Sequence, residues 1–535
     1  GADNTFVGDN AGGATTTAAD NTAVGSSALL VNSTGAGNTA VGAYALDANT
    51  TASSNTAVGV HALGAATTGG VNTAIGRVSL FNNTTGSNNV GVGYGSLQAN
   101  TTASNNVAVG YNALNSNTTG TENTAVGKGA LTANTTASGV TAVGEDALGA
   151  NTTGASNTAV GEGALNSNTT ASGNTAVGMG ALAVNTGDAA NNTAIGTSAL
   201  AANTTGTPNT AVGFQALDAN TTGSRNTAIG VGSLGANTTA NDNTALGYAS
   251  LLTNTTGHSN VAVGHDAMES NTTGSENTAV GFDALKANTT AENNVAIGRL
   301  AGTGITTGSQ NTIVGAAAMQ TNSTGAGNVA IGLSALAVAQ GSDNVAVGRS
   351  AGDAVTTAAN NILIGTDAGG SLTTGGNHVA IGKDSLAQCT TGTENTGVGF
   401  KALAAVTDGA LNVAVGASAG IGITTASSNV FMGYKAGENI TTGNSNTALG
   451  YYALRNVSGS ITQNVAVGLH ALYDCTANNN VAVGVNALFE MQSGTESIAI
   501  GNFAHSNATT GNSNTIVGYA AGDALTNGAQ NHLMG

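Results

Sequence analysis

The sequence has very little of what an ordinary soluble domain contains. Its 535 residues include one proline, no tryptophan, 3% aromatic residues and only 7% charged residues, whereas an average domain has about 25% charged residues. This composition argues against a set of conventional globular domains. It also differs from that of disordered chains, which combine high charge with few aliphatic residues, because here aliphatic residues recur at fixed places. Order must therefore come from repetition.

Positive charge and long hydrophobic runs are scarce as well. The chain has ten lysines and arginines in all, within a net charge of −17, so the clustered cations that bind nucleic acid are missing. No run of eighteen apolar residues is present to cross a membrane, and nothing at the start has the pattern of a signal peptide. We therefore expect no nucleic-acid partner and no membrane span. The start at Gly1 leaves open a removed leader or a longer polypeptide.

What the sequence does contain is a seventeen-residue repeat, which reads NTAVGAYALDANTTASS at 38–54 and recurs throughout the chain. Its glycine recurs 32 times from Gly8 to Gly535, and only four intervals depart from seventeen residues, each by one residue. Such a strict register is typical of a solenoid whose coils stack. We predict an all-β fold, a parallel β-solenoid (β-roll) with 17-residue coils, about 31 of them, as a single continuous array over residues 1–535.

Aligning the repeats on this glycine predicts the core. The residue directly before it is always Val, Ile, Leu or Met, and Leu or Met usually stands four places after it. We predict that both columns are buried, and that a Val212→Asp substitution exposes its region to protease. An asparagine stands four places before the glycine in 29 of 32 motifs; it either forms a ladder of amides up the stack or suits the turn before the strand. The predicted core and ladder residues are Asn38, Val41, Gly42, Leu46, Asn55, Val58, Gly59, Leu63, Val212, Gly213 and Leu217.

The strand before the glycine is apolar at adjacent positions. Alanine usually stands two places before the glycine, and Thr, Val or Ile stands three places before it in all but the last motif. Since successive side chains of a strand point to opposite faces, adjacent apolar columns indicate that both faces are covered. One face looks into the coil, and the other needs a neighbouring sheet or another chain.

In the second half of the coil, the apolar residue changes its position in some repeats. In seven coils glycine replaces the leucine four places after the motif glycine, and in six of them an aliphatic residue appears three places later: Ile305, Val355, Leu372, Ile423, Ile440 and Leu525. This displacement indicates a helical or tight turn, or a bent strand.

The coil closes with Asn-Thr-Thr turns, for which we expect accessible side chains. The same triplets match the glycosylation acceptor pattern at Asn49, Asn117, Asn134, Asn151 and Asn203, although turn chemistry explains them equally well.

No residue pattern predicts catalysis, a metal site or a cofactor. The carboxylates and the seven histidines are scattered, so we expect neither an enzyme nor a metalloprotein. Cys389 and Cys475 lie five coils apart, about 24 Å at the usual strand spacing, which is beyond disulfide reach; a buried small hydrophobe is favoured over an intermolecular bridge. The threonine columns raise an ice-binding alternative, weakened because the strand threonine alternates with valine. Tyrosines seldom occupy consecutive coils, so no continuous sugar-stacking platform is expected.

The NTAVG and NVAIG strands resemble the SVAIG-type strands of YadA-like heads in trimeric autotransporter adhesins, although those coils are shorter. The whole repeat is also similar to repeat arrays of bacterial surface proteins and phage tail-fibre-like proteins. The resemblance implies a left-handed β-roll in which three chains pack side by side, and a trimer would cover the second face of the strand.

From these observations we predict a non-catalytic structural protein that forms a rigid extracellular fibre or adhesive surface appendage. Its expected partner is itself, as a homotrimer or a head-to-tail filament, with a host surface or glycan as a possible target. The expected location is the extracellular space or cell surface, or alternatively a phage virion. The alternative function is that of a tail-fibre-like protein that binds a receptor or glycan.

Overall fold

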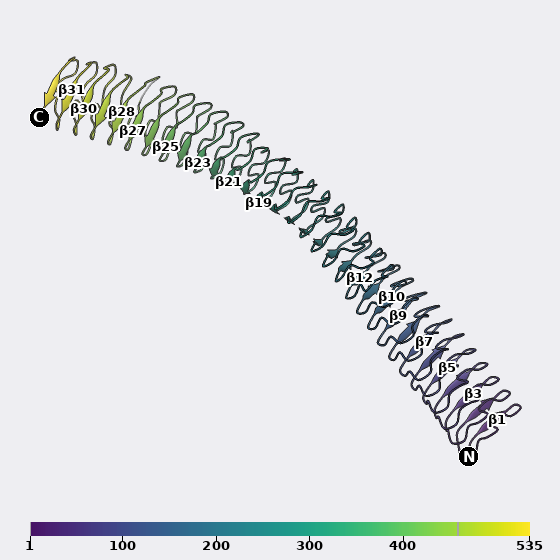
Figure 1. The fold of residues 1–535 in the computed structure, drawn as a ribbon. Helices are drawn as coiled ribbons and strands as arrows, with labels where there is room; N and C mark the ends of the chain where they lie inside the picture. Colours follow the sequence, from purple (N-terminus) through teal and green to yellow (C-terminus); the bar gives the residue numbers. More distant parts are fainter. Residues whose placement is uncertain (1, 457–459) are drawn as a thin grey trace. The chain divides into compact units, whose positions relative to one another are not determined.

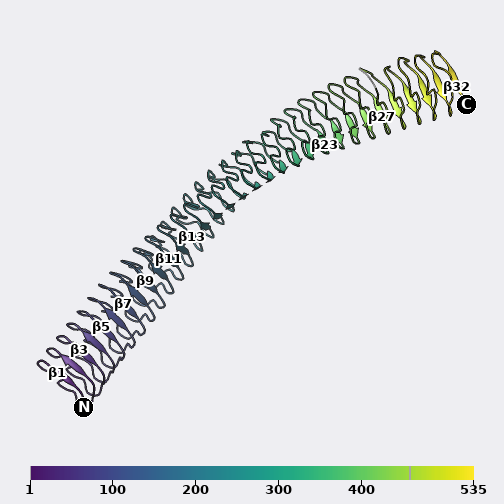
Figure 2. The same cartoon turned by 180° about the vertical axis from the view of Figure 1, so that it is seen from behind.

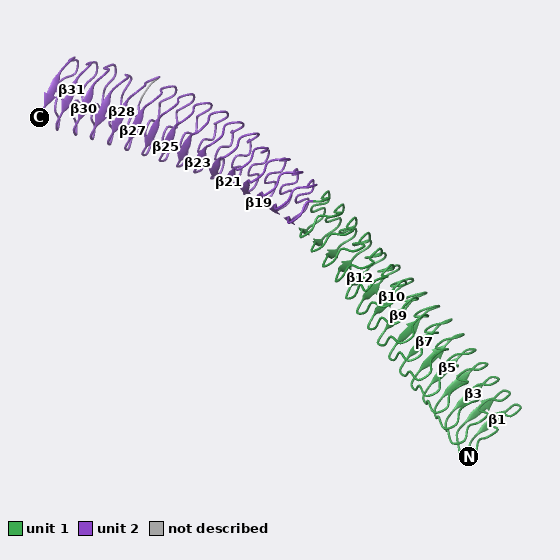
Figure 3. Ribbon diagram, viewed as in Figure 1, with its two compact units in different colours: residues 1–273 green, residues 274–535 purple. Residues whose placement is uncertain are grey.

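The computed structural model describes residues 2–456 and 460–535, and it confirms the predicted fold class. The chain is an all-β, parallel β-solenoid of about 31 turns with seventeen-residue spacing, and the described residues contain no helix. It divides into two compact units, Gly1–Thr273 and Gly274–Gly535, coloured separately in Figure 3. That residues 1–535 form one continuous array stays a prediction.

Every strand is three residues long and directly precedes a motif glycine. Unit 1 holds β1 (Thr5–Val7), β2 (Thr22–Val24), β3 (Thr39–Val41), β4 (Thr56–Val58), β5 (Thr73–Ile75), β6 (Val90–Val92), β7 (Val107–Val109), β8 (Thr124–Val126), β9 (Thr141–Val143), β10 (Thr158–Val160), β11 (Thr175–Val177), β12 (Thr193–Ile195), β13 (Thr210–Val212), β14 (Thr227–Ile229), β15 (Thr244–Leu246) and β16 (Val261–Val263). Unit 2 holds β17 (Thr278–Val280), β18 (Val295–Ile297), β19 (Thr312–Val314), β20 (Val329–Ile331), β21 (Val345–Val347), β22 (Ile362–Ile364), β23 (Val379–Ile381), β24 (Thr396–Val398), β25 (Val413–Val415), β26 (Val430–Met432), β27 (Thr447–Leu449), β28 (Val465–Val467), β29 (Val481–Val483), β30 (Ile498–Ile500), β31 (Thr515–Val517) and β32 (His532–Met534).

Within each unit, successive strands pair in parallel and in register. Thr39, Ala40 and Val41 face Thr56, Ala57 and Val58, so identical columns lie directly above one another. Figures 1 and 2 show this side-by-side order along each unit. The irregular intervals keep the register too, because Thr175 pairs with Thr193 across eighteen residues and Val329 pairs with Val345 across sixteen. The extra or missing residue is therefore absorbed in the turns.

The strand buries its middle residue, and this corrects one prediction. Ala40 is completely buried, whereas Val41 is half-exposed, and the same contrast recurs in almost every coil. The predicted core residues Val41, Val58 and Val212 therefore lie outside the core. The physical reason is the two-residue period of a strand: when alanine points into the coil, the residues on either side must point out. The inward position is small because the facing leucine fills the narrow interior.

That facing segment supplies the other half of the core, as predicted. Leu46, Leu63 and Leu217 are completely buried, together with the alanine that precedes each of them. Leu46 adopts a left-handed backbone with φ of 52°, and its carbonyl accepts a hydrogen bond from the Asn49 N–H at 3.2 Å. This bond over three residues defines a tight turn, which confirms that alternative over a bent strand.

Exchanges of large and small residues compensate one another between the two halves of the coil. Where Leu363 replaces the inward alanine, glycine replaces the facing leucine twice: Gly369 in the same coil and Gly352 in the preceding one. A Cβ on Gly352 would lie 2.6 Å from a Leu363 methyl. Phe431 fits against Gly420 and Gly437 in the same way. The displaced aliphatics are buried at Ile305, Val355, Leu372, Ile423 and Ile440, whereas Leu525 is half-buried. The interior thus keeps a nearly constant volume, as close packing requires.

Candidate functional surfaces

The predicted asparagine ladder exists, with a geometry of its own. Asn38 and Asn55 are completely buried. The Asn55 backbone N–H donates to Asn38 Oδ1 at 3.0 Å, and Asn55 Nδ2 donates to the Gly69 carbonyl at 3.1 Å. Direct amide-to-amide bonds join some coils, for example Asn38 Nδ2 to Asn21 Oδ1 at 3.2 Å. The column therefore acts both as a ladder and as a brace for the turn before the strand.

A second asparagine ladder runs through the Asn-Thr-Thr turns, where accessible side chains were expected. Asn49 Nδ2 donates to Asn32 Oδ1 at 2.9 Å and to the Ala52 carbonyl at 3.1 Å. The glycosylation candidates are buried as well, at Asn49, Asn117, Asn134, Asn151 and Asn203. The prediction of exposure is wrong for these side chains, because the turn's inward carbonyls need buried donors. The signal was present in the sequence: wherever this column departs from asparagine, its residues are uncharged and almost all apolar.

Both cysteines lie in this second column, and their predicted burial is confirmed. Cys389 and Cys475 are free thiols with no exposed surface. Burial raises the pKa of Cys389 to about 12 and that of Cys475 to about 11. Cys389 Sγ lies 3.8 Å from Nε2 of His378, which takes the place of an asparagine in the first ladder and bonds the Gly392 carbonyl at 2.7 Å. A neutral, inaccessible thiol is a packing residue and a poor nucleophile.

His505 occupies a leucine position of the core, and its burial leads us to expect that the C-terminal coils are acid-sensitive. It is 1% exposed, and neither ring nitrogen has a hydrogen-bond partner among the described residues. Burial lowers its pKa, and the approach of the Leu525 backbone and the nearby Asp523 carboxylate oppose this shift only in part. A lowered pKa in the folded state means that stability is complete above the ordinary value of about 6.5 and declines as the pH falls below it.

We therefore expect hydrogen exchange of residues 501–525 to accelerate at pH 5 relative to pH 7.5, after correction for intrinsic exchange rates. His505→Leu should restore the leucine column and abolish the difference in this segment. The coils around Leu217 serve as the internal reference. Equal acceleration in the variant and the parent chain would show that His505 is not the responsible group.

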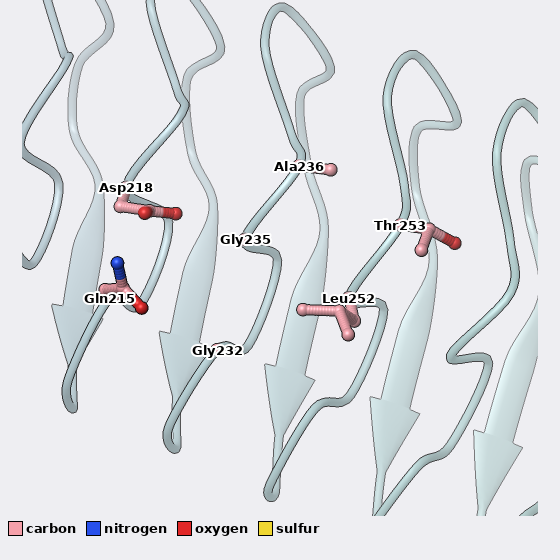
Figure 4. A pocket seen from close by; sticks show the side chains of 7 residues that line it. All are labelled: Gln215, Asp218, Gly232, Gly235, Ala236, Leu252 and Thr253. Carbon is pink, nitrogen blue, oxygen red and sulfur yellow. The ribbon is translucent and has the colours of Figure 1, made fainter.

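A depression in unit 1 arises where one coil lacks side chains. Gly232 and Gly235 leave a notch between Gln215 and Asp218 of the preceding coil and Leu252 and Thr253 of the following one, with a volume of about 290 Å³ (Figure 4). Burial raises the pKa of Asp218. Asp218 is the single ionisable side chain that lines the notch, so the depression contains no pair of groups for acid–base chemistry.

Aromatic side chains form short ladders between neighbouring coils, although tyrosines seldom occupy consecutive coils in the sequence. Tyr434 stacks on Tyr451 with ring centroids 5.3 Å apart, and Tyr473 stacks on Phe489 at 5.0 Å. The Arg455 guanidinium lies 4.0 Å above the ring of Tyr452 and pairs with Glu438. Because the rings stack coil upon coil, their faces cover one another. The cluster braces neighbouring coils, while Tyr434 and Tyr451 stay 40% and 48% exposed.

The outer face of the strands forms a surface that runs along each unit. Each strand points its first and third residues outward, and in the described strands none of these residues is Lys, Arg, Asp or Glu. Aliphatic residues at the third position are about 36–44% exposed in many coils, including Val109, Val160, Ile229 and Leu246. A contiguous exposed apolar patch larger than roughly 300–600 Å² is unusual on a monomer and marks an interaction site.

The two units differ in the chemistry of this sheet face. The first outward residue is threonine in 13 of the 16 strands of unit 1, but in only 5 of the 16 strands of unit 2, where valine and isoleucine dominate. Both outward columns of unit 2 are therefore mostly aliphatic, whereas unit 1 presents a mostly hydroxyl column beside an aliphatic one.

These features define a parallel β-solenoid repeat protein with a charge-free sheet face. No protein-family model matches the chain, and a search of curated proteins finds no significant match. The described residues include no helix long and apolar enough to cross a membrane.

Proposed function

We propose that this protein is a non-catalytic structural element of an extracellular or cell-surface fibre, assembled from several copies of the chain. The rigid β-solenoid is compatible with a fibre, since within each unit backbone hydrogen bonds join the strands and turns of successive described coils. The resemblance of the NTAVG strands to trimeric adhesin heads supports the surface location and the side-by-side assembly. A phage virion is the alternative location.

The observation that carries the proposal is the aliphatic sheet face of unit 2. In β20, β21, β22 and β23 both outward residues of every strand are Val or Ile, and all are at least partly exposed. Covering such a face with a second copy would gain roughly 25 cal/mol for each Å² of apolar surface removed from water. The face carries no charge that association would have to desolvate.

The test measures the mass of the full chain in solution by sedimentation velocity and light scattering. We expect the parent chain to be oligomeric, and the Val347→Lys/Ile364→Lys variant to be monomeric because it places buried charge in the interface. Lysines at the exposed turn residues Thr357 and Thr374 form the matched control and should leave the oligomer intact. Circular dichroism confirms that each variant folds. A monomeric parent chain at all concentrations would contradict the proposal.

A further inference from the structure

The sheet face of unit 1 contains an uninterrupted array of two chemical groups. Eight consecutive strands, β8 to β15, begin with an outward threonine, from Thr124 to Thr244, and each has an outward aliphatic residue two places later. All eight threonines are half-exposed. Neighbouring strands lie about 4.8 Å apart, and outward residues of one strand lie about 6.6 Å apart. The result is a regular two-column grid of hydroxyl and methyl groups.

The hydroxyl groups of this array are available to an outside partner. Among the described residues, no side-chain hydrogen bond joins any of these eight hydroxyl groups to the protein. The turn threonines differ, because Thr135 Oγ1 donates to the Thr152 carbonyl at 3.1 Å and its neighbours continue this pattern. The sheet-face hydroxyls can therefore be satisfied only by water or by a bound surface.

The grid is also rigid before anything binds. β-Branched threonine, valine and isoleucine have strongly restricted χ1 angles. The strands that hold them pair in register, as Thr193, Ala194 and Ile195 do with Thr210, Ala211 and Val212. A partner that matches the grid would pay little for ordering side chains, which is the main benefit of preorganisation.

The chemistry of the grid distinguishes between two occupants. A second protein chain would have to supply a partner for each hydroxyl, since each buried hydroxyl left unpaired costs about 1–3 kcal/mol. Crystalline water supplies donors and acceptors in all directions, so it can satisfy each hydroxyl without a matching side chain. A charge-free face leaves this order undisturbed, because it holds no ion with a hydration shell of its own.

We propose that the sheet face of β8–β15 binds ice. The proposal goes beyond the structural function and concerns unit 1 alone, so it does not depend on assembly through unit 2. Along the whole chain, valine often replaces threonine as the first strand residue, which argues against ice binding. In β8–β15, however, the eight threonine strands are consecutive and their hydroxyls point outward.

The test is thermal hysteresis and ice-crystal shaping by the full chain. We expect the parent chain to separate the melting and freezing points and to facet growing crystals. Thr193→Lys/Thr210→Lys interrupts the middle of the array and should remove most of this separation. Thr205→Lys/Thr222→Lys places the same charges on exposed turns of neighbouring coils and should retain it. Thermal melting above 0 °C establishes that both variants fold.

Three results would overturn the proposal. The first is a parent chain with no hysteresis and no faceting; the second is equal activity of the two lysine variants. The third is dissociation of an oligomer by Thr193→Lys/Thr210→Lys with ice activity unchanged, which would identify a second copy as the occupant. The unit 2 variant Val347→Lys/Ile364→Lys tests assembly separately, so the two proposals fail independently.

Discussion

Replacing Gly213 with alanine is expected to unfold the coils around it. A Cβ at this position would lie 2.5 Å from the Gly230 carbonyl oxygen and 2.7 Å from its carbon, and the backbone has φ of 139°. The obstacle is the backbone of the next coil, which cannot rotate away as a side chain can. Gly42 and Gly59 stand in the same relation to the coils that follow them. We expect a loss of more than about 4 kcal/mol, in the range that marks exceptional substitutions.

The matched control is Gly163→Ala. Gly163 also has a positive φ, 63°, but a Cβ there would meet nothing within 4 Å. Its cost is therefore limited to backbone strain of about 1 kcal/mol. Hydrogen exchange and limited proteolysis should locate the damage of Gly213→Ala in adjacent coils, since a solenoid is stabilised by nearest neighbours. Equal effects of the two substitutions would show that the glycine column is not in backbone contact.

The second large effect is expected from Leu217→Asp. Leu217 is completely buried in the continuous leucine column, so aspartate would place an unpaired carboxylate in an apolar interior. Such a substitution costs several kcal/mol even after local relaxation. We expect rapid proteolytic cleavage near residue 217 and a clear drop in the denaturant midpoint of the chain.

Val212→Asp provides the comparison and reverses the expectation based on sequence alone. Val212 is half-exposed on the sheet face, so a carboxylate there stays hydrated. Its cost is limited to strand preference and neighbour contacts, about 1 kcal/mol. Protease resistance should therefore survive in Val212→Asp and fail in Leu217→Asp. Similar cleavage of both variants would contradict the assignment of the alanine column as the inward one.

Particular residues show how far sequence patterns reach in this chain. The pattern predicts Asn38 and Gly42 correctly because their columns barely vary, and it predicts Leu46 correctly because leucine is the commonest residue of its column. Val41 was assigned wrongly because its column and that of Ala40 are both apolar, and composition cannot distinguish inward from outward. The pattern alone favours the larger residue as the core, whereas the narrow coil has room only for the smaller one.

The candidate surfaces likewise separate what the sequence reveals from what only the structure shows. The absence of charge from the strand columns is visible in the sequence, but their exposure required the structure. The second ladder at Asn49 was overlooked because Asn-Thr-Thr is typical of solvent-exposed turns. Its donors point inward because the neighbouring coil supplies the acceptor Asn32 Oδ1. No local sequence window contains that contact.

The sequence by itself determined the coil length, the parallel stacking and the register, because a nearly constant seventeen-residue repeat places equivalent residues above one another whatever the coil's cross-section. Only the tertiary structure decided which face of each strand turns inward and how Leu363 compensates for Gly352. Both depend on how one coil closes around a shared interior and on contacts between different coils. Side-chain volume is conserved across that interior, so the packing depends on residues of neighbouring repeats together and cannot be inferred from one repeat alone.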